Sequence, residues 1–428
     1  MKSSVLSPAS FFDKVVIWLL VLSQILKTYG TVSYWNFASI PTYILGLVFL
    51  FLVISKKRTF RLGTSMPKEC FIFFAYWAIV HILTNQGSVI PYNTIEAALM
   101  FVLFWGVVTY EQFPRLVKYY TWTAWVCIAF FAVQEITFRT SGIRISGIFS
   151  FLPIALNEVS DASSFIVNKM TSDRGAAFFS EPAYLSQYLM PLLAISLFNK
   201  KDKKYILKSV IIVITIFLTA SGTGIIAIGA VLAVYMLYLM TSKSIVSKLF
   251  VMFLFIGTFI FVPYFLNTEI GEKMLSRQSE LSFEYDSGSR SGFMRLYRGL
   301  YVYDDYSVSE KIFGNDNNAA IKEHISHSVF AFTFADDNDT FFNGVQYTLL
   351  RTGLIGLLIM IMLHVRIFKQ NNSCGRAILM GFVTLMFMEA VFFGNNMILY
   401  LIFAERFKNN AQPVSYTHLR AHETPEHL

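Results

Sequence analysis

The residue types best suited to chemistry lie in two long polar segments, 139–181 and 267–342, and directly beside them. Their arginines are candidates for binding an anionic group, because a guanidinium is permanently charged and forms two parallel hydrogen bonds to phosphate or carboxylate oxygens. These candidates are Arg174, Arg277, Arg290, Arg295, Arg298 and Arg351. The alternative is that they lie on solvated helices and pair with carboxylates of the same segment.

Further side chains could transfer a proton beside such an anion. His324 and His327 titrate near neutral pH, and Glu181 could act as a base or stabilise positive charge in a transition state. Each is also compatible with a capping or surface role, and His81 is interpreted as a packed or interfacial residue. The cysteines are isolated, and no soluble domain carries a clustered Asp-x-Asp metal motif, so we predict no metal site and no cofactor.

The first polar segment ends where an apolar helix is predicted to begin. The sequence RGAAFFSEPAY, residues 174–184, predicts Ser180 as the N-cap of this helix, with Pro182 in its first turn. The unpaired N–H groups at a helix N-terminus favour an anion such as a lipid phosphate, and Arg174 could add a bidentate contact. This junction is therefore a predicted anion-binding site.

Composition indicates the class of protein. Of the 428 residues, 55% are hydrophobic and 14% are charged. This charged fraction is far below the roughly 25% of an ordinary water-soluble domain. Apolar runs recur along nearly the whole chain and predict an all-α polytopic membrane protein with about twelve transmembrane helices. The expected spans are 15–27, 37–55, 70–84, 95–109, 118–138, 183–198, 205–220, 222–240, 247–266, 343–363, 376–393 and 394–405.

The charges of the loops predict the orientation of these spans. Basic residues follow every even-numbered span, as Lys56, Lys57 and Arg58 follow the second, whereas the odd-numbered exits are nearly uncharged apart from the two long segments. The positive-inside rule then places both termini in the cytoplasm and both long segments outside the cell inner (cytoplasmic) membrane. The net charge of +8 is spread over alternate loops, which disfavours a nucleic-acid partner.

Residues 1–408 are predicted to form one integral membrane domain. The run from Val15 to Leu26 has no small-residue cleavage site after it, which favours a retained first helix. Residues 409–428 form a polar tail, and PVSYTHLRAHETPEHL, residues 413–428, is interpreted as a spurious translated end. The histidines of this tail are therefore excluded from the site.

One arginine is predicted to lie within a span. Arg351 falls about two turns into the tenth span, where a charge at the helix centre costs roughly 2.5–3.5 kcal/mol and needs a partner. It could form a structural ion pair with Glu389, near the outer end of the eleventh span, or it could bind a diphosphate. Tyr297, Tyr301 and Tyr303 are candidate platforms for sugar rings.

The chain resembles the O-antigen and capsular polysaccharide polymerases of the Wzy type, within the superfamily that also contains O-antigen ligases. The resemblance extends to about residue 408 and rests on the many spans, on a smaller and a larger external loop, and on the sequences RGAAFFSEPAY, SGSRSGFMRLYRGL, IFGNDNN and FFNGVQYTLLRTGLIG. Many relatives carry a basic residue after the seventh span that is missing from residues 219–224. If relatives use that basic residue to bind the diphosphate, the resemblance implies that Arg174, Arg290 or Arg351 binds it here.

The resemblance implies that polyprenyl diphosphate-linked oligosaccharide repeat units are joined into a surface polysaccharide, O-antigen or capsule, outside the cytoplasmic membrane. Such a reaction needs cations at the leaving diphosphate and a base at the attacking hydroxyl. The implied partners are the lipid-linked oligosaccharide, membrane lipid, a chain-length regulator and a flippase. The alternatives are a ligase that transfers the finished glycan to another acceptor and a transporter for the lipid-linked glycan.

Overall fold

The structure, a computed structural model, describes residues 10–31, 36–60, 66–85, 90–155, 162–242, 244–268, 271–272, 291–327 and 342–407. Within these ranges every regular element is a helix, and strand-type pairing occurs only as isolated bridges, such as the one between Tyr29 and Ile154. The expected all-α fold class is therefore confirmed for this part of the chain. The predictions for Arg277, Arg290 and the tail 409–428 lie outside the described residues.

Each of the expected spans coincides with a helix. These helices are α1 (Phe11–Leu26), α2 (Ser39–Ile54), α3 (Lys68–Thr84), α4 (Tyr92–Val107), α5 (Phe113–Ser141), α7 (Pro182–Phe198), α8 (Tyr205–Leu218), α9 (Gly222–Met240), α10 (Ile245–Leu266), α15 (Gly344–Gln370), α16 (Ser373–Met388) and α17 (Asn395–Arg406). By length and apolar composition, α5, α9 and α15 qualify among the described residues as helices that could cross a membrane. The two long segments contribute α6 (Ala162–Thr171), α12 (Ser291–Asp305), α13 (Val308–Phe313) and α14 (Asn318–His327).

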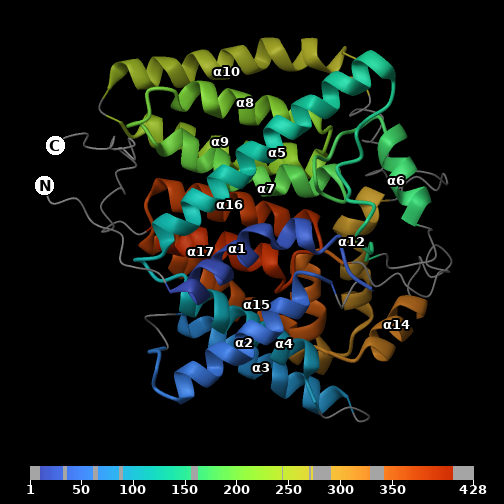
Figure 1. Cartoon of the computed structure of the whole chain (residues 1–428). Helices are drawn as coiled ribbons and strands as arrows, with labels where there is room; N and C mark the ends of the chain where they lie inside the picture. The colour runs from blue at the N-terminus through green and yellow to red at the C-terminus, as the bar shows by residue number, and fades with distance from the viewer. Residues whose placement is uncertain are drawn as a thin grey trace, which may run out of the picture.

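The longer helices form one bundle. In Figure 1, α10, α8, α9 and α7 lie one below another and run in roughly the same direction. Helix α16 packs against α9 and α7, and α15 packs against α3. Helix α17 is short but buried on all sides, from Met397 to Ala404. Such an all-round apolar helix is stable only when other helices enclose it, which explains its place inside the bundle.

The outside of the bundle is strongly apolar. Large hydrophobic side chains are exposed on α2, α8 and α10, among them Ile44, Leu47, Phe51, Leu207, Val210, Ile214, Met252, Phe253 and Ile256. A soluble monomer rarely exposes contiguous apolar surface of this extent, and water would make such exposure costly. These faces and the three long apolar helices indicate that the protein associates with a membrane.

Contacts between distant parts of the chain define two ends of the bundle. We call the loop end the end formed by residues 27–31, 84–85, 172–184, 219–221, 342–344 and 389–394. There, the Lys27 Nζ lies 3.6 Å from the centroid of the Tyr184 ring, and the Arg174 guanidinium donates to the Ala220 carbonyl at 3.4 Å. Residues that precede or follow many different helices therefore meet at this end.

The basic end is formed by residues 55–60, 66–69, 108–112, 199–205, 366–376 and 405–407. Arg58, which follows α2, pairs there with Asp13 in the first turn of α1, and Arg366 pairs with Glu69. Most of the basic connections between helices lie at this end. Successive helices of the bundle thus run alternately from the basic end to the loop end and back.

Candidate functional site

Both long polar segments fold over the loop end. Figure 1 shows α6, from the first segment, and α12 and α14, from the second, at the right of the view, beyond the ends of the long helices. Helix α12 packs against α15 and α16, and α14 packs against α12. The polar residues singled out in the sequence are therefore gathered at one end of the bundle rather than distributed along it.

The first polar group at this end is the Asp316 cluster, which comprises His81, Asp316, Asn318 and Arg351. The His81 Nδ1 lies 2.7 Å from the Asp316 Oδ2, and Arg351 pairs with the other carboxylate oxygen of Asp316. The second guanidinium nitrogen of Arg351 donates to the Asn318 Oδ1 at 2.8 Å. The Asp316 side chain is fully buried, so the Arg351 guanidinium and the hydrogen bond with His81 offset the cost of removing its charge from water.

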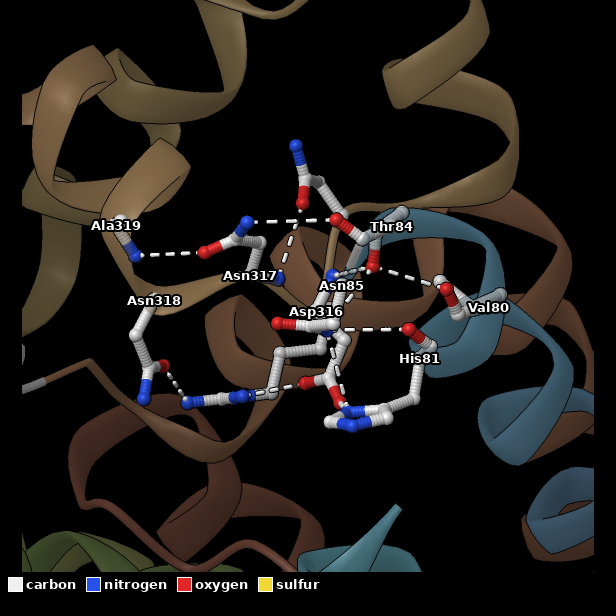
Figure 2. Close-up of polar contacts among 10 residues, drawn as sticks. Val80, His81, Thr84, Asn85, Asp316, Asn317, Asn318 and Ala319 are labelled. Carbon is white, nitrogen blue, oxygen red and sulfur yellow. Dashed lines mark hydrogen bonds and ion pairs between the residues drawn. The ribbon is translucent and has the colours of Figure 1, made fainter. Parts of the chain in front are cut away.

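The backbone on either side of Asp316 is anchored to the end of α3. Figure 2 shows Asp316 and Asn317 facing His81 and Thr84. The Asp316 N–H donates to the Thr84 Oγ1 at 3.2 Å, and the Asn317 side-chain amide donates to the Thr84 carbonyl at 3.3 Å. The last turn of α3 thus supplies the Thr84 carbonyl, which is at the helix C-terminus, and the Thr84 hydroxyl, which also donates to the Val80 carbonyl at 2.9 Å.

Two glycines allow this segment to approach α15. Helix α15 is interrupted at Gly353, whose φ of 61° and ψ of −168° are essentially restricted to glycine. The break leaves the Leu350 carbonyl free to accept from the Asn315 N–H at 2.9 Å. A Cβ atom on Gly314 would lie 2.5 Å from the Arg351 carbonyl oxygen, so only glycine permits this backbone contact. The IFGNDNN sequence is therefore a docking segment that fits a kinked helix.

Of the two alternatives for Arg351, a structural ion pair is present, but its partner is not the expected Glu389. The structure places Asp316, and not Glu389, against the Arg351 guanidinium. Glu389 instead follows the end of α16, where its carbonyl accepts from the Gly344 N–H at 2.8 Å and its carboxylate interacts with Lys27. Sequence distance could not reveal the true pair, because Asp316 belongs to a segment whose path is set by tertiary contacts.

His81 was underestimated by the sequence interpretation. A carboxylate at Nδ1 fixes one tautomer of the imidazole and makes Nε2 the proton acceptor. The His81 Nε2 is buried and has no hydrogen-bond partner among the described residues. The alternation of loop charges predicts that the C-terminal end of this helix lies on the same side as the two long segments, and this was the available signal for His81.

The second polar group lies near the N-terminus of α7, and we call it the α7 group. It comprises Lys27, Lys169, Arg174, Glu181 and Glu389. Lys27 interacts electrostatically with Glu181 and Glu389, and Lys169 interacts with Glu181. The Lys169 ammonium also donates to the Phe179 carbonyl. Burial lowers the pKa of Lys169 to about 8, and the Glu181 carboxylate limits the shift. Glu181 itself is exposed, so its carboxylate is accessible from the loop end.

The predicted N-cap of α7 is shifted by one residue. Glu181, with the extended backbone of a cap (φ −139°, ψ 151°), precedes the helix, and Pro182 occupies the first turn as expected. The Glu181 side chain makes no capping hydrogen bond, so it does not satisfy the N–H groups of the first turn. The assignment to Ser180 failed because serine is the better intrinsic cap, whereas the observed position is set by the proline that follows Glu181.

Buried polar contacts hold the first segment in place before α7. The Arg144 side chain is 2% exposed, pairs with Glu135 at 2.7 Å and donates to the carbonyl of Asp173 at 3.1 Å. The Gln134 side chain accepts from the Ala177 N–H at 2.8 Å, where Ala177 has a positive φ of 47°. The path of the backbone past Arg174 is therefore fixed by residues of α5.

The arginine-rich helix of the second segment is present. Arg295 and Arg298 both lie on α12, as their spacing predicted, and Arg298 is buried with its guanidinium 5.5 Å from the Phe342 ring centroid. The Gln346 side chain of α15 donates to the Leu296 carbonyl at 2.8 Å. Arg298 therefore faces packed protein, which favours a structural contribution from this residue.

The two candidate histidines lie on α14 and face carboxylates. The His324 Nδ1 is 2.7 Å from the Asp305 Oδ2, its Nε2 is 3.4 Å from the Glu310 Oε1, and the His327 Nδ1 is 3.4 Å from Asp305. Burial raises the pKa of Glu310, but hydrogen bonds from Ser307 and Asn315 outweigh it and bring the pKa to about 2. With both of its nitrogens engaged, His324 is a poor base in this arrangement.

The two polar groups are neighbours through α15. Glu389, in the α7 group, is hydrogen-bonded through its carbonyl to Gly344, the first residue of α15. Arg351, in the Asp316 cluster, follows seven residues later, which corresponds to about 10 Å along a helix axis. The two groups therefore lie near the same end of α15.

Fold and site together define an all-helical, membrane-associated protein with a mixed cluster of cations and carboxylates where two long segments cover one end of its bundle. A scan against protein-family models and a search of curated proteins gave no match for the chain.

Proposed function

We propose that this protein polymerises polyprenyl diphosphate-linked oligosaccharide repeat units into a surface polysaccharide at the outer face of the cytoplasmic membrane. The observation that carries the proposal is that Lys27 and Lys169 both interact with the exposed Glu181 at the N-terminus of α7, while Arg174, from the same segment as Glu181, lies against the Ala220 carbonyl at the loop end. This is the combination of charges required by a reaction that expels a diphosphate and accepts a proton.

In this proposal the protein has about twelve transmembrane helices, with the loop end outside and the basic end and both termini in the cytoplasm. The apolar outer faces of α2, α8 and α10 contact lipid. The polyprenyl chain of the donor lies in the bilayer, and its diphosphate reaches the α7 group at the membrane boundary. A flippase supplies the lipid-linked units, and a chain-length regulator acts on the product.

The reaction is a glycosyl transfer. A hydroxyl oxygen of one glycan forms a bond to the anomeric carbon of the other, the bond from that carbon to the diphosphate oxygen breaks, and polyprenyl diphosphate leaves. Arg174 and Lys169 stabilise the negative charge of the leaving group, together with the positive end of the α7 dipole. Arg174 has the fork of donors suited to phosphate oxygens.

Glu181 is the base that the geometry favours for the attacking hydroxyl. It is exposed at the loop end, where a substrate hydroxyl can approach it, and it lies within electrostatic range of Lys27 and Lys169. Arg351 has a different role in this proposal, because Asp316 already balances its charge. Arg351 positions the docking segment and so fixes the second loop over the site.

Deletion of the gene in its host tests the function. A polymerase deletion leaves single repeat units on the final acceptor, because transfer continues without extension. Long glycan accumulating on the lipid carrier would instead identify a ligase, and unextended lipid-linked units retained on the cytoplasmic side would identify a transporter. Restoration of long chains by the wild-type gene, and failure of a Glu181→Gln gene to restore them, would assign the activity to this site.

A further inference from the structure

Three helices of the second long segment bring potential metal ligands together away from the α7 group. Asp305 is the last residue of α12, and His324 and His327 lie one turn apart on α14. The ligand atoms of these three side chains all lie within 4.8 Å of one another. Glu310, on α13, approaches the same imidazole from the opposite side, with its Oε1 3.4 Å from the His324 Nε2.

We propose that Asp305, His324 and His327 form a binding site for a zinc-class divalent cation. Two imidazole nitrogens and one carboxylate oxygen are a ligand set that zinc accepts, whereas magnesium and calcium prefer oxygen ligands alone. Three protein ligands leave the fourth tetrahedral position for water or for an oxygen of an anionic ligand.

The distances are close to those of a tetrahedral site. Zinc bonds of about 2.1 Å place neighbouring ligand atoms about 3.4 Å apart in a tetrahedron. The His327 Nδ1 and the Asp305 Oδ2 are already 3.4 Å apart. The His324 Nδ1 and the same oxygen are 2.7 Å apart because they share a proton, and they would separate when the ion replaces that proton. Small rotations of exposed side chains are sufficient for this change.

Glu310 completes the arrangement from outside the ligand set. A metal-bound histidine commonly donates its other ring N–H to a carboxylate, which fixes the tautomer and orients the ring. Glu310 occupies that position for His324 and is itself held by the Asn315 side chain, which donates to its Oε1 at 2.8 Å. Helix α13 begins with a capping box between Ser307 and Glu310. This local hydrogen bonding fixes the position of the Glu310 carboxylate.

The ion would join α12 to α14. Helix α12 contacts α15 through the Gln346 side chain, and α14 directly follows the Asp316 cluster. A single ion between them would fix both ends of the docking segment relative to each other. The His327 side chain is 57% exposed, so the open coordination position is accessible from solvent.

Zinc binding to the full chain tests this site directly. The protein is purified in detergent without a histidine tag, in a background with His418, His422 and His427 replaced by alanine, because tail histidines would bind zinc independently. Equilibrium dialysis against Zn²⁺ should give one bound ion per chain, and magnesium should not displace it. Zinc-edge X-ray absorption should show two imidazole ligands on the bound ion.

Variants separate this site from adventitious binding. His324→Ala/His327→Ala should abolish the ion, and Glu310→Gln should weaken binding about 10- to 100-fold. Glu323→Gln, an exposed carboxylate on the same helix, is the matched control and should bind as the parent does. No zinc in the parent, equal zinc in the double variant, or an absorption spectrum without imidazole ligands would each overturn the site. The absorption spectrum needs only the parent protein, so misfolding of a variant cannot obscure the result.

Discussion

The His81 Nδ1 lies 2.7 Å from the Asp316 Oδ2, although the two residues are 235 positions apart in the sequence. Arg351 binds the other oxygen of the same carboxylate. One buried carboxylate therefore joins α3, α15 and the docking segment of the second loop. This buried charge therefore contributes to the position of the loop, in addition to the hydrogen bonds that Asn315 and Asn317 make with α15 and α3.

Asp316→Asn should destabilise the protein by about 3–5 kcal/mol, because it leaves the cationic partner of a buried pair uncompensated. Thermal or denaturant unfolding in detergent measures the change. The matched control is Asp202→Asn, which removes the carboxylate of the partly exposed Lys208–Asp202 pair and should cost no more than about 1 kcal/mol. Adding Arg351→Gln to Asp316→Asn should cost less than the sum of the single changes. Strict additivity would contradict the coupling.

Gly353→Ala should destabilise the junction of α15 with the docking segment by about 1–3 kcal/mol. A Cβ at this position would lie 2.4 Å from the Ile312 carbonyl oxygen, in a backbone conformation that alanine does not adopt. Gly229→Ala is the control, since a Cβ there meets no atom within 4 Å and should stabilise α9 by about 0.5–1 kcal/mol. Equal unfolding midpoints for the two variants would contradict the kink as described.

Arg174→Ala should slow polymerisation in membranes by roughly ten- to a hundredfold, which corresponds to the loss of one charge-assisted contact of about 1.5–3 kcal/mol. Arg174→Lys should recover only part of the rate, because lysine keeps the charge without the fork of donors. Arg139→Ala removes an exposed arginine from the last turn of α5 and should leave the rate unchanged. Chain length and the rate of lipid-linked unit consumption are the measurements, and equal rates for both alanine variants would exclude the proposed arginine contact.

The polymerisation rate should fall as the pH rises through about 8. Burial lowers the pKa of Lys169 to about 8, although the Glu181 carboxylate opposes this shift. Below that pH the lysine is charged and stabilises an anion; above it, this stabilisation is lost. Lys169→Arg keeps the positive charge at alkaline pH, so the fall should move to higher pH. Unchanged pH profiles for wild type and Lys169→Arg would assign the fall to another group.

Cysteine labelling should report the orientation of the bundle. The native cysteines Cys70, Cys127 and Cys374 are buried, so background labelling should be low. A membrane-impermeant reagent should label Val167→Cys on α6 from outside in intact cells, and Lys203→Cys only after permeabilisation. Both positions are exposed, so access depends on the membrane and not on burial. The opposite pattern would invert the proposed topology.

Helix positions could be predicted well, and the polar contacts could not. Each expected span coincides with a helix, and Arg295 and Arg298 share the helix that their spacing indicated. These predictions depend on local periodicity and on runs of apolar residues. The partner of Arg351 and the engagement of His324 depend instead on which loops meet, and neither follows from spacing within a segment.

The sequence by itself determined the helical bundle, its apolar outer surface and the separation of basic connections from two long polar segments, because hydrophobic runs and charges act locally. Only the tertiary structure decided that Asp316 lies between His81 and Arg351, and that Lys27 and Lys169 join Glu181 at the start of α7. The physical reason is that a buried charge must find its partner wherever the packed backbone brings one within a few ångströms, and that distance is set by the whole fold.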